Sequence, residues 1–368
     1  MAEMCVPAYL KKTEYCDKGD KCKNLVDCDK GDNLKFKCDS FCKKFKKKII
    51  LDINISDQNI KDQKIQEIGL IAQEKLNDKE FSTVIDVHNR VQNSGYPNYL
   101  CCRIPVKSGI NISFFRQNLL DYDDKIICEF LEFGAPIGFK ETLLEDDNTD
   151  IVNHKGAREF DDVLKYLFKE ASYGAIIGPF DKNPFPGHFK ILPLNTVSKK
   201  DTLDRRVILD LSFPAGNSVN DFISKDNYLG EIIQLSYPKV DDLVNIIKDK
   251  GAKCLVFKKD LKRAYRQIPI DPGDLHLVGF QWGDKLTDRV LPMGLRSSAQ
   301  ICQRIATAAS FIYYKMGYMV VNYLDDLGGA ETVNKACDAY DALGGLLAKC
   351  GLEESVQKGV APTTRMDF

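Results

Sequence analysis

The chain has 368 residues, of which 44 % are apolar and 29 % charged, and its formal net charge is −1. These values are ordinary for a soluble globular protein of two or three domains. They exclude a transmembrane chain, because no stretch approaches the roughly 18 apolar residues that span a bilayer. The N-terminus also lacks a secretory signal, so we expect an intracellular protein, cytoplasmic or nuclear, whose thirteen cysteines are free thiols or metal ligands.

The first 150 residues carry no catalytic signal. Residues 1–48 are rich in lysine and contain six cysteines: Cys5, Cys16, Cys22, Cys28, Cys38 and Cys42. Zinc modules place ligands in close pairs, and only Cys38 and Cys42 have nearly that spacing, with no histidine nearby. The segment therefore favours a basic, partly disordered arm over a zinc site. We expect residues 49–150 to form a mixed N-terminal extension.

From residue 155 onward, apolar residues recur with helical or strand-like spacing. The expected helices cover residues 160–171, 240–247, 301–312 and 333–349, and glycines at 174, 251 and 317 follow the first three. Strand-like runs occupy residues 206–210 and 254–257, and the second leads to Asp260. This order of elements predicts a mixed helix-and-sheet domain over residues 151–368.

Two adjacent carboxylates, Asp325 and Asp326, follow a short apolar run and precede two glycines. The pattern predicts a strand, a tight turn and a returning strand. An acidic surface turn is the simpler alternative for an isolated pair of aspartates. If the pair is buried, however, its mutual repulsion costs several kcal/mol, which a divalent cation removes.

Asp260 also ends an apolar run, so we expect it to meet Asp325 at one edge of a sheet. Converging carboxylates suit Mg²⁺, which takes oxygen ligands and shares them with phosphates. Two such ions can clamp the attacking and leaving oxygens of a phosphoryl displacement. Basic residues surround Asp260 and also cluster between residues 199 and 206, where they can neutralise phosphate charge.

These residues belong to four ordered motifs, at residues 199–210, 257–265, 291–299 and 323–326. The last has the sequence Tyr-Leu-Asp-Asp, which matches the Tyr-x-Asp-Asp box of reverse transcriptases. From about residue 155 to its end, the chain resembles the fingers and palm of that family. Residues 206–221, 263–269 and 291–296 are more closely similar to DIRS-type retrotransposons, which encode a tyrosine recombinase.

The resemblance implies an α+β fold of right-hand polymerase type. The palm is an antiparallel sheet with helices packed on one face, and the fingers precede it. The implied activity is RNA-directed DNA polymerase, a nucleotidyltransferase that adds deoxynucleotides to a primer 3′ end by two-metal transfer. Its partners are an RNA or DNA template with a primer, and deoxynucleoside triphosphates.

The resemblance also assigns the metal site. Asp260 and Asp325 are the principal ligands of two Mg²⁺ ions, with Mn²⁺ as an alternative, and the carbonyl oxygen of Leu261 adds a ligand. Asp326 completes the acidic cluster and is less often a direct ligand. All three aspartates count as catalytic residues in this assignment.

The nucleotide site is assigned in the same way. Lys199 and Arg206 hold the β- and γ-phosphates, as a point charge and a planar fork. Tyr265 stacks under the sugar and excludes a 2′-hydroxyl. Met293 and Gly294 shape the floor of the site. Lys358 stands where the family carries a basic residue that protonates the leaving pyrophosphate.

The family pattern continues into a primer-grip hairpin, a thumb and RNase H, whereas this sequence ends at Phe368. We therefore expect a truncated copy with an intact site and weak processive synthesis, which would gain from the missing segments of the same element. One alternative is a catalytically inactive, nucleic-acid-binding remnant. The other is an RNA-directed RNA polymerase, which Tyr265 disfavours because that family needs room for the 2′-hydroxyl.

Overall fold

The computed structural model describes residues 105–140 and 151–366, apart from short gaps at 160–161, 181, 186, 200–203 and 234–236, and a few residues between 64 and 71. Residues 59–368 form one compact unit. The basic arm predicted over residues 1–48, with its candidate zinc ligands, lies outside the described residues.

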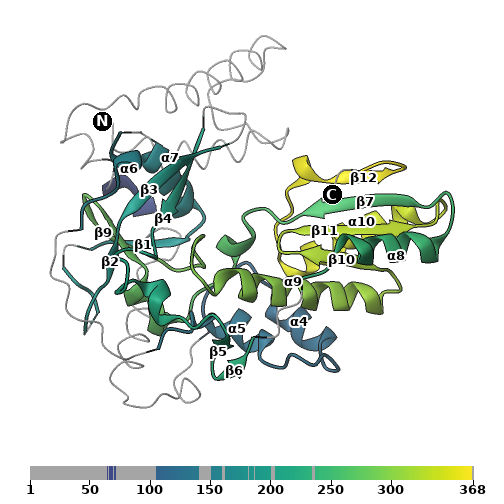
Figure 1. Cartoon of the computed structure of the whole chain (residues 1–368), viewed down its shortest axis with the longest axis horizontal. Coiled ribbons are helices and arrows are strands. Elements are labelled where there is room, and N and C mark those ends of the chain that lie inside the picture. Colours follow the sequence, from purple (N-terminus) through teal and green to yellow (C-terminus); the bar gives the residue numbers. More distant parts are fainter. Residues whose placement is uncertain are drawn as a thin grey trace, which may run out of the picture. The chain divides into compact units, whose positions relative to one another are not determined.

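A four-stranded antiparallel sheet near the C-terminus has the strand order β10–β11–β7–β12 (Figure 1). Its strands are β7 (Leu255–Asp260), β10 (Val320–Tyr323), β11 (Asp326–Glu331) and β12 (Val360–Thr363). The predicted strand that leads to Asp260 is confirmed, as is the hairpin around the paired aspartates. Antiparallel pairing of β7 with β11 sets Asp260 directly opposite Asp326.

Helices cover both faces of this sheet. Helices α9 (Ser298–Lys315) and α10 (Ala336–Cys350) lie on one face and are joined by a hydrogen bond from the Tyr313 hydroxyl to the Ala339 carbonyl. Helix α8 (Val240–Lys250) lies on the other face. Helices on one face of this sheet were predicted from the sequence, and α9 and α10 confirm them, but the location of α8 on the other face was not predicted.

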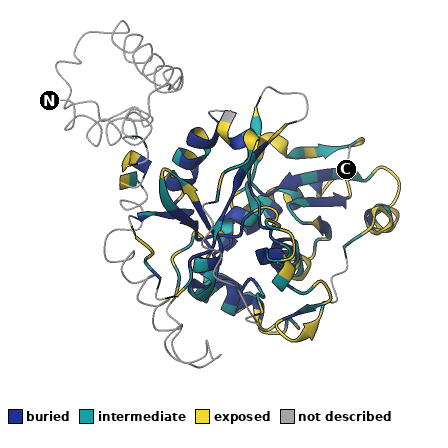
Figure 2. Cartoon of the chain, turned by 60° about the vertical axis from the view of Figure 1, so that its left-hand side comes forward, coloured by how far each residue is buried: buried dark blue, intermediate teal, exposed yellow. Residues whose placement is uncertain are grey.

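The packing of α8 follows from its apolar stripe. Leu243 and Ile246 are buried against Val321 of β10 and Ala330 of β11. This contact covers the ends of the strands that are distant from the aspartates, because Ala330 lies four residues beyond Asp326. Figure 2 shows the buried residues concentrated in the strands and in the helix faces that contact them.

A second sheet has the order β1–β9–β8–β2, in which only the β2–β8 pair is parallel. Its strands are β1 (Ile176–Phe180), β2 (Ile191–Leu192), β8 (Gly279–Trp282) and β9 (Asp284–Asp288). The separate hairpin β3 (Leu194–Ser198) and β4 (Arg205–Leu209) contains the predicted strand at residues 206–210. A small hairpin, β5 (Asn227–Tyr228) and β6 (Glu231–Ile232), lies elsewhere in the chain.

Short helices complete the unit. The α-helices α6 (Lys155–Glu159) and α7 (Asp162–Ser172) lie on the side of the second sheet. The chain also forms the 3₁₀ helices η1 (Val219–Phe222), η2 (Ala264–Gln267), η3 (Pro272–Leu277) and η4 (Val356–Lys358). No helix in the described ranges is long and apolar enough to cross a membrane.

Two helices of the predicted N-terminal extension pack against the C-terminal part of the unit. They are α4 (Ile112–Asn118) and α5 (Ile127–Phe133). The N–H of Asn111 donates to the carbonyl of Cys350 at 2.9 Å, which places α4 at the end of α10. Arg304 of α9 forms an ion pair with Asp124 at 2.7 Å. Residues 105–140 thus support the helices that underlie the first sheet.

Candidate active site

Three aspartates converge at one end of the antiparallel sheet. Asp260 is the last residue of β7, Asp326 is the first residue of β11, and the two strands pair at these positions. Asp325 lies in the turn between β10 and β11, and its carbonyl accepts a hydrogen bond from the N–H of Leu261 at 2.7 Å. The structure therefore brings together Asp260, Leu261, Asp325 and Asp326, which the sequence assigned to one site.

The turn that carries Asp325 is held by a buried glutamine. Leu324 has a φ of 54°, a conformation that is costly for a residue other than glycine. Gln303 of α9, which is 2 % exposed, accepts from the N–H of Leu324 at 2.8 Å and donates to the carbonyl of Asn322 at 2.8 Å. Both hydrogen bonds fix the backbone on either side of Tyr323. The sequence motifs did not single out Gln303. A polar residue within the mostly apolar helix predicted at residues 301–312 was the signal that could have identified it.

Replacing Gln303 with alanine is expected to destabilise the protein by about 2–4 kcal/mol, because the half-buried N–H of Leu324 and the buried carbonyl of Asn322 lose their partners. The strained turn should also relax and move Asp325. Chemical denaturation measures the first effect. Gln300, half-buried one turn earlier in the same helix, is the matched control, and its alanine variant should change stability by less than about 0.5 kcal/mol. Equal stabilities of the two variants would show that Gln303 does not hold the turn.

Asp260 is a buried carboxylate with an unusual set of contacts. Its side chain is 4 % exposed, and Oδ2 accepts from Lys358 Nζ at 3.0 Å. No donor in the described part of the chain reaches Oδ1, which is also buried. Burial raises the pKa of Asp260, the Lys358 ammonium opposes this, and the charges of Asp325 and Asp326 add to the increase.

The segment after α10 fixes the backbone next to Asp260. The N–H of Ser355 donates to the Asp260 carbonyl at 2.7 Å, and the N–H of Lys262 donates to the Glu353 carbonyl at 2.9 Å. The following helix, η4, then brings Lys358 to the carboxylate. Lys258 lies on β7, the strand of Asp260, and its Nζ is 3.0 Å from Oδ1 of Asp326 on the neighbouring strand β11. Each of these two carboxylates therefore has a lysine beside it.

The donor chemistry of the site suits a hard divalent cation. Carboxylate oxygens are the ligands that Mg²⁺ prefers, and a buried oxygen without a hydrogen-bond donor gains most from a cation. Within the described residues, however, no three His, Cys, Asp or Glu side chains are arranged so that they could hold an ion. The ammonium groups of Lys258 and Lys358 neutralise the carboxylates in the arrangement observed.

Tyr265 lies in η2, five residues after Asp260. Its half-buried phenol has a pKa well above the ordinary value, chiefly because of burial, and the neighbouring Cys302 and Asp325 raise it further. The hydroxyl therefore stays protonated at neutral pH. Tyr265 therefore lies close enough to Asp325 for the charge of that carboxylate to contribute to its raised pKa.

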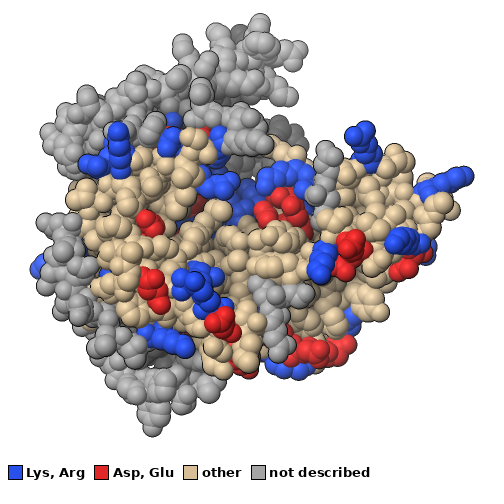
Figure 3. Space-filling model, viewed as in Figure 1, with Lys and Arg blue, Asp and Glu red and all other residues tan. Residues whose placement is uncertain are grey.

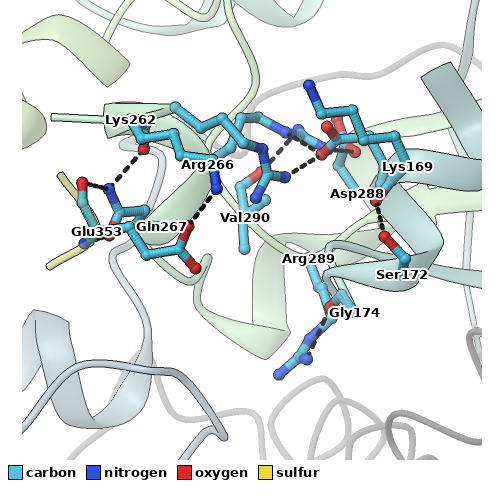
Figure 4. A network of polar contacts seen from close by, with 12 residues as sticks. Lys169, Ser172, Gly174, Lys262, Arg266, Gln267, Asp288, Arg289, Val290 and Glu353 are labelled. Atoms are coloured by element: carbon cyan, nitrogen blue, oxygen red, sulfur yellow. Dashed lines mark hydrogen bonds and ion pairs between the residues drawn. The ribbon is translucent and has the colours of Figure 1, made fainter. Parts of the chain in front are cut away.

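A buried ion network is centred on Arg266, the residue that follows Tyr265 (Figure 4). Arg266 donates from Nη2 to Asp288 Oδ1 at 2.7 Å and from Nε to Glu170 Oε2 at 2.9 Å. Arg263 donates to the same Glu170 oxygen at 2.6 Å. Burial alone would lower the pKa of Arg266, but Asp288 and Glu170 raise it well above the usual value. The network ties η2 to helix α7 and strand β9.

The predicted phosphate-binding residues lie on the β3–β4 hairpin. Arg206 is exposed and pairs across the hairpin with Val197. The Lys199 ammonium lies 3.4 Å from Asp204 at the hairpin end. The structure thus groups Lys199 and Arg206 on one element, as predicted.

Met293 and Gly294 lie in the loop before α9. Met293 is 40 % exposed, and Gly294 has a φ of 97°, which favours glycine. Asn220 holds this loop, because its amide donates to the Gly294 carbonyl at 2.9 Å and accepts from the Arg296 N–H at 2.8 Å. A Cβ at Gly294 would lie 3.6 Å from the Leu209 carbonyl, so the loop adjoins the end of β4. Asn220 lies within residues 206–221, but it was not singled out from the sequence as a residue of the site.

Helix α9 connects the loop of Met293 and Gly294 with the turn that carries Asp325. It begins next to the loop of Met293 and Gly294, and its Gln303 holds the turn of Asp325. The face viewed in Figure 3 shows acidic and basic side chains in contact near the middle of the molecule. The arrangement combines an acidic cluster with cationic side chains that are suited to phosphate.

Comparison with solved structures identifies the architecture. The structure of "the foamy viral protease-reverse transcriptase dRH in complex with ds DNA" superposes with a TM-score of 0.50 at 15 % identity, over 76 % of this chain and 48 % of that chain. The chain has a reverse transcriptase-like fold. Native prototype foamy virus protease-reverse transcriptase gives a TM-score of 0.45 at 18 % identity, over 64 % of this chain and 28 % of that chain.

This chain therefore spans less than half of the length of either structure. No protein-family profile matches the sequence. No curated protein sequence matches it either.

Proposed function

We propose that this chain is the catalytic part of an RNA-directed DNA polymerase. The observation that carries the proposal is the opposition of Asp260 and Asp326 on paired strands, with Asp325 in the intervening hairpin turn. The reverse transcriptase-like fold supports it. Residues 151–368 would form the fingers and palm, and the DIRS-like motifs favour an origin in a retrotransposon.

Two Mg²⁺ ions, or Mn²⁺, would be held by Asp260, Asp325 and the Leu261 carbonyl, with Asp326 completing the cluster. When bound, such ions stabilise the charge that develops on the attacking and leaving oxygens. The protein supplies the frame: β7 and β11 fix the carboxylates, and Gln303 fixes the turn. A site on paired strands holds its ligands more rigidly than a loop does.

The remaining assigned residues would bind the incoming nucleotide. Lys199 and Arg206 would approach from the hairpin to hold the phosphates, and Met293 and Gly294 would support the base pair. An RNA or DNA template with its primer would bind beside them, largely through phosphate contacts. For Lys358, which the sequence assigned to the leaving pyrophosphate, the observed partner is Asp260.

The direct assay is extension of a DNA primer on an RNA template with deoxynucleotides and Mg²⁺. We expect synthesis that stops when Mg²⁺ is chelated. One observation favours a second candidate, an inactive nucleic-acid-binding remnant: lysines neutralise two of the three carboxylates. Tight binding of template-primer without synthesis at any Mg²⁺ or Mn²⁺ concentration would support the remnant and overturn the polymerase.

Replacing Tyr265 with alanine is expected to relax the choice of sugar. Without the ring, a 2′-hydroxyl no longer clashes, so ribonucleotide incorporation should rise about tenfold or more relative to deoxynucleotide incorporation. The ratio of the two kcat/KM values measures the effect. Tyr265→Phe keeps the ring and should keep the discrimination. Equal use of both sugars by the unaltered protein would contradict the assignment of Tyr265.

A further inference from the structure

The two lysines at the acidic cluster differ in exposure. Lys258 belongs to β7, which has a neighbouring strand on either side, and its side chain is 18 % exposed. The Lys358 side chain is 61 % exposed. Their partners differ in the opposite sense, because Asp260 is 4 % exposed and Asp326 is 36 % exposed. The most buried carboxylate of the cluster is thus neutralised by the more exposed ammonium.

The backbone of Lys358 is anchored by hydrogen bonds, whereas its exposed side chain reaches Asp260 with the ammonium alone. The Lys358 N–H donates to the Ser355 carbonyl at 2.9 Å, and the Ser355 N–H donates to the Asp260 carbonyl at 2.7 Å. Two residues later, Val360 of β12 pairs with Lys258 of β7. The Lys358 ammonium can therefore leave Asp260 by side-chain rotation, without any change in the sheet.

We propose that Lys358 is a displaceable counter-cation of the metal site. In the metal-free protein its ammonium neutralises Asp260, and a divalent cation that binds Asp260 must displace it. The Lys358 ammonium is 61 % exposed and can regain its hydration when it leaves, so a cation of charge +2 with several oxygen ligands displaces it from Asp260. Lys358 thereby lowers the metal affinity of the free protein. This inference rests on the proposed function, because it assumes that Asp260 is a metal ligand.

The test is Mn²⁺ binding to the full chain without nucleotide, measured from the electron paramagnetic resonance signal of free Mn²⁺. We expect Lys358→Gln to lower the Mn²⁺ dissociation constant about three- to tenfold, since a competing positive charge is removed. Lys358→Arg retains the charge and should bind nearly as the unaltered protein does. The matched control is Lys315→Gln, which removes a 41 % exposed ammonium from its pair with Asp121 and should leave the affinity unchanged.

A second measurement guards against loss of folding in the Lys358→Gln variant. Saturating Mn²⁺ should raise its melting temperature more than that of the unaltered protein, because tighter binding stabilises more. Equal or weaker Mn²⁺ affinity in Lys358→Gln would overturn the inference and leave the proposed function standing. If neither folded protein binds Mn²⁺ and the Asp260→Asn variant behaves identically, both the inference and the proposed function fail.

Discussion

Replacing Asp325 with asparagine is expected to lower template-dependent incorporation of deoxynucleotides by at least about a thousandfold. The substitution removes one charged ligand from the site at which charge develops in the transition state. Asp260→Asn should have an effect of similar size. Single-turnover primer extension at saturating template-primer measures the chemical step for each variant.

The loss of activity should occur without loss of the fold. Burial and the neighbouring carboxylates raise the pKa of Asp260 above its unfolded value. Its ionised form therefore costs stability above the raised pKa, and this cost disappears as the pH falls through it. A neutral asparagine removes the same cost, so the melting temperature of Asp260→Asn should stay constant or rise by a few degrees, on the order of 1–3 °C.

The matched control for these variants is Asp338→Asn, which neutralises an exposed aspartate in the first turn of α10. It should retain full activity. Incorporation by Asp325→Asn within about tenfold of the unaltered protein would remove Asp325 from the catalytic site. A parallel fall in melting temperature and activity of Asp260→Asn would indicate unfolding in place of lost chemistry.

Replacing Arg266 with methionine is expected to destabilise the protein by about 3–5 kcal/mol. The guanidinium is the shared partner of Glu170 and Asp288, which are 3 % and 2 % exposed. Burial already raises the pKa of Asp288, an increase that Arg266 only partly offsets. Without Arg266, two buried carboxylates lose a positive neighbour. Thermal unfolding should then shift downward by roughly 10 °C.

A surface arginine provides the control for this substitution. Arg116 pairs with Glu129 and Glu132, but its side chain is 47 % exposed, so Arg116→Met should cost less than about 1 kcal/mol. A double replacement of Glu170 and Arg266 by apolar residues leaves one buried carboxylate, Asp288, without Arg266 in place of two, so it should recover part of the lost stability. Equal stabilities of Arg266→Met and Arg116→Met would show that the buried network contributes nothing.

Local sequence patterns predicted most elements that position the site. Apolar spacing gave α7, α8, α9 and α10, and the turn chemistry of two aspartates followed by two glycines gave the β10–β11 hairpin. Asp260 could be placed because a short apolar strand ends at it. These features depend on residues close together in the chain, where periodicity and turn preferences act.

The supporting contacts were not predictable, because they join distant segments. Gln303 and Asn220 are single polar residues whose partners lie 21 and 74 positions away. Glu170 lies within the apolar stripe of α7, and only the fold brings Arg266 to it. The pairing of Lys258 with Asp326 depends on the register of β7 against β11, which the sequence does not specify.

The most direct measurement is addition of a single nucleotide to a DNA primer on four RNA templates that differ only in the base opposite the first added position. We predict that the chain adds the complementary deoxynucleotide on each template, and only with a divalent cation. Failure of the folded, template-bound protein to add any nucleotide would contradict a polymerase function. Addition that is the same on all four templates would contradict template-directed synthesis.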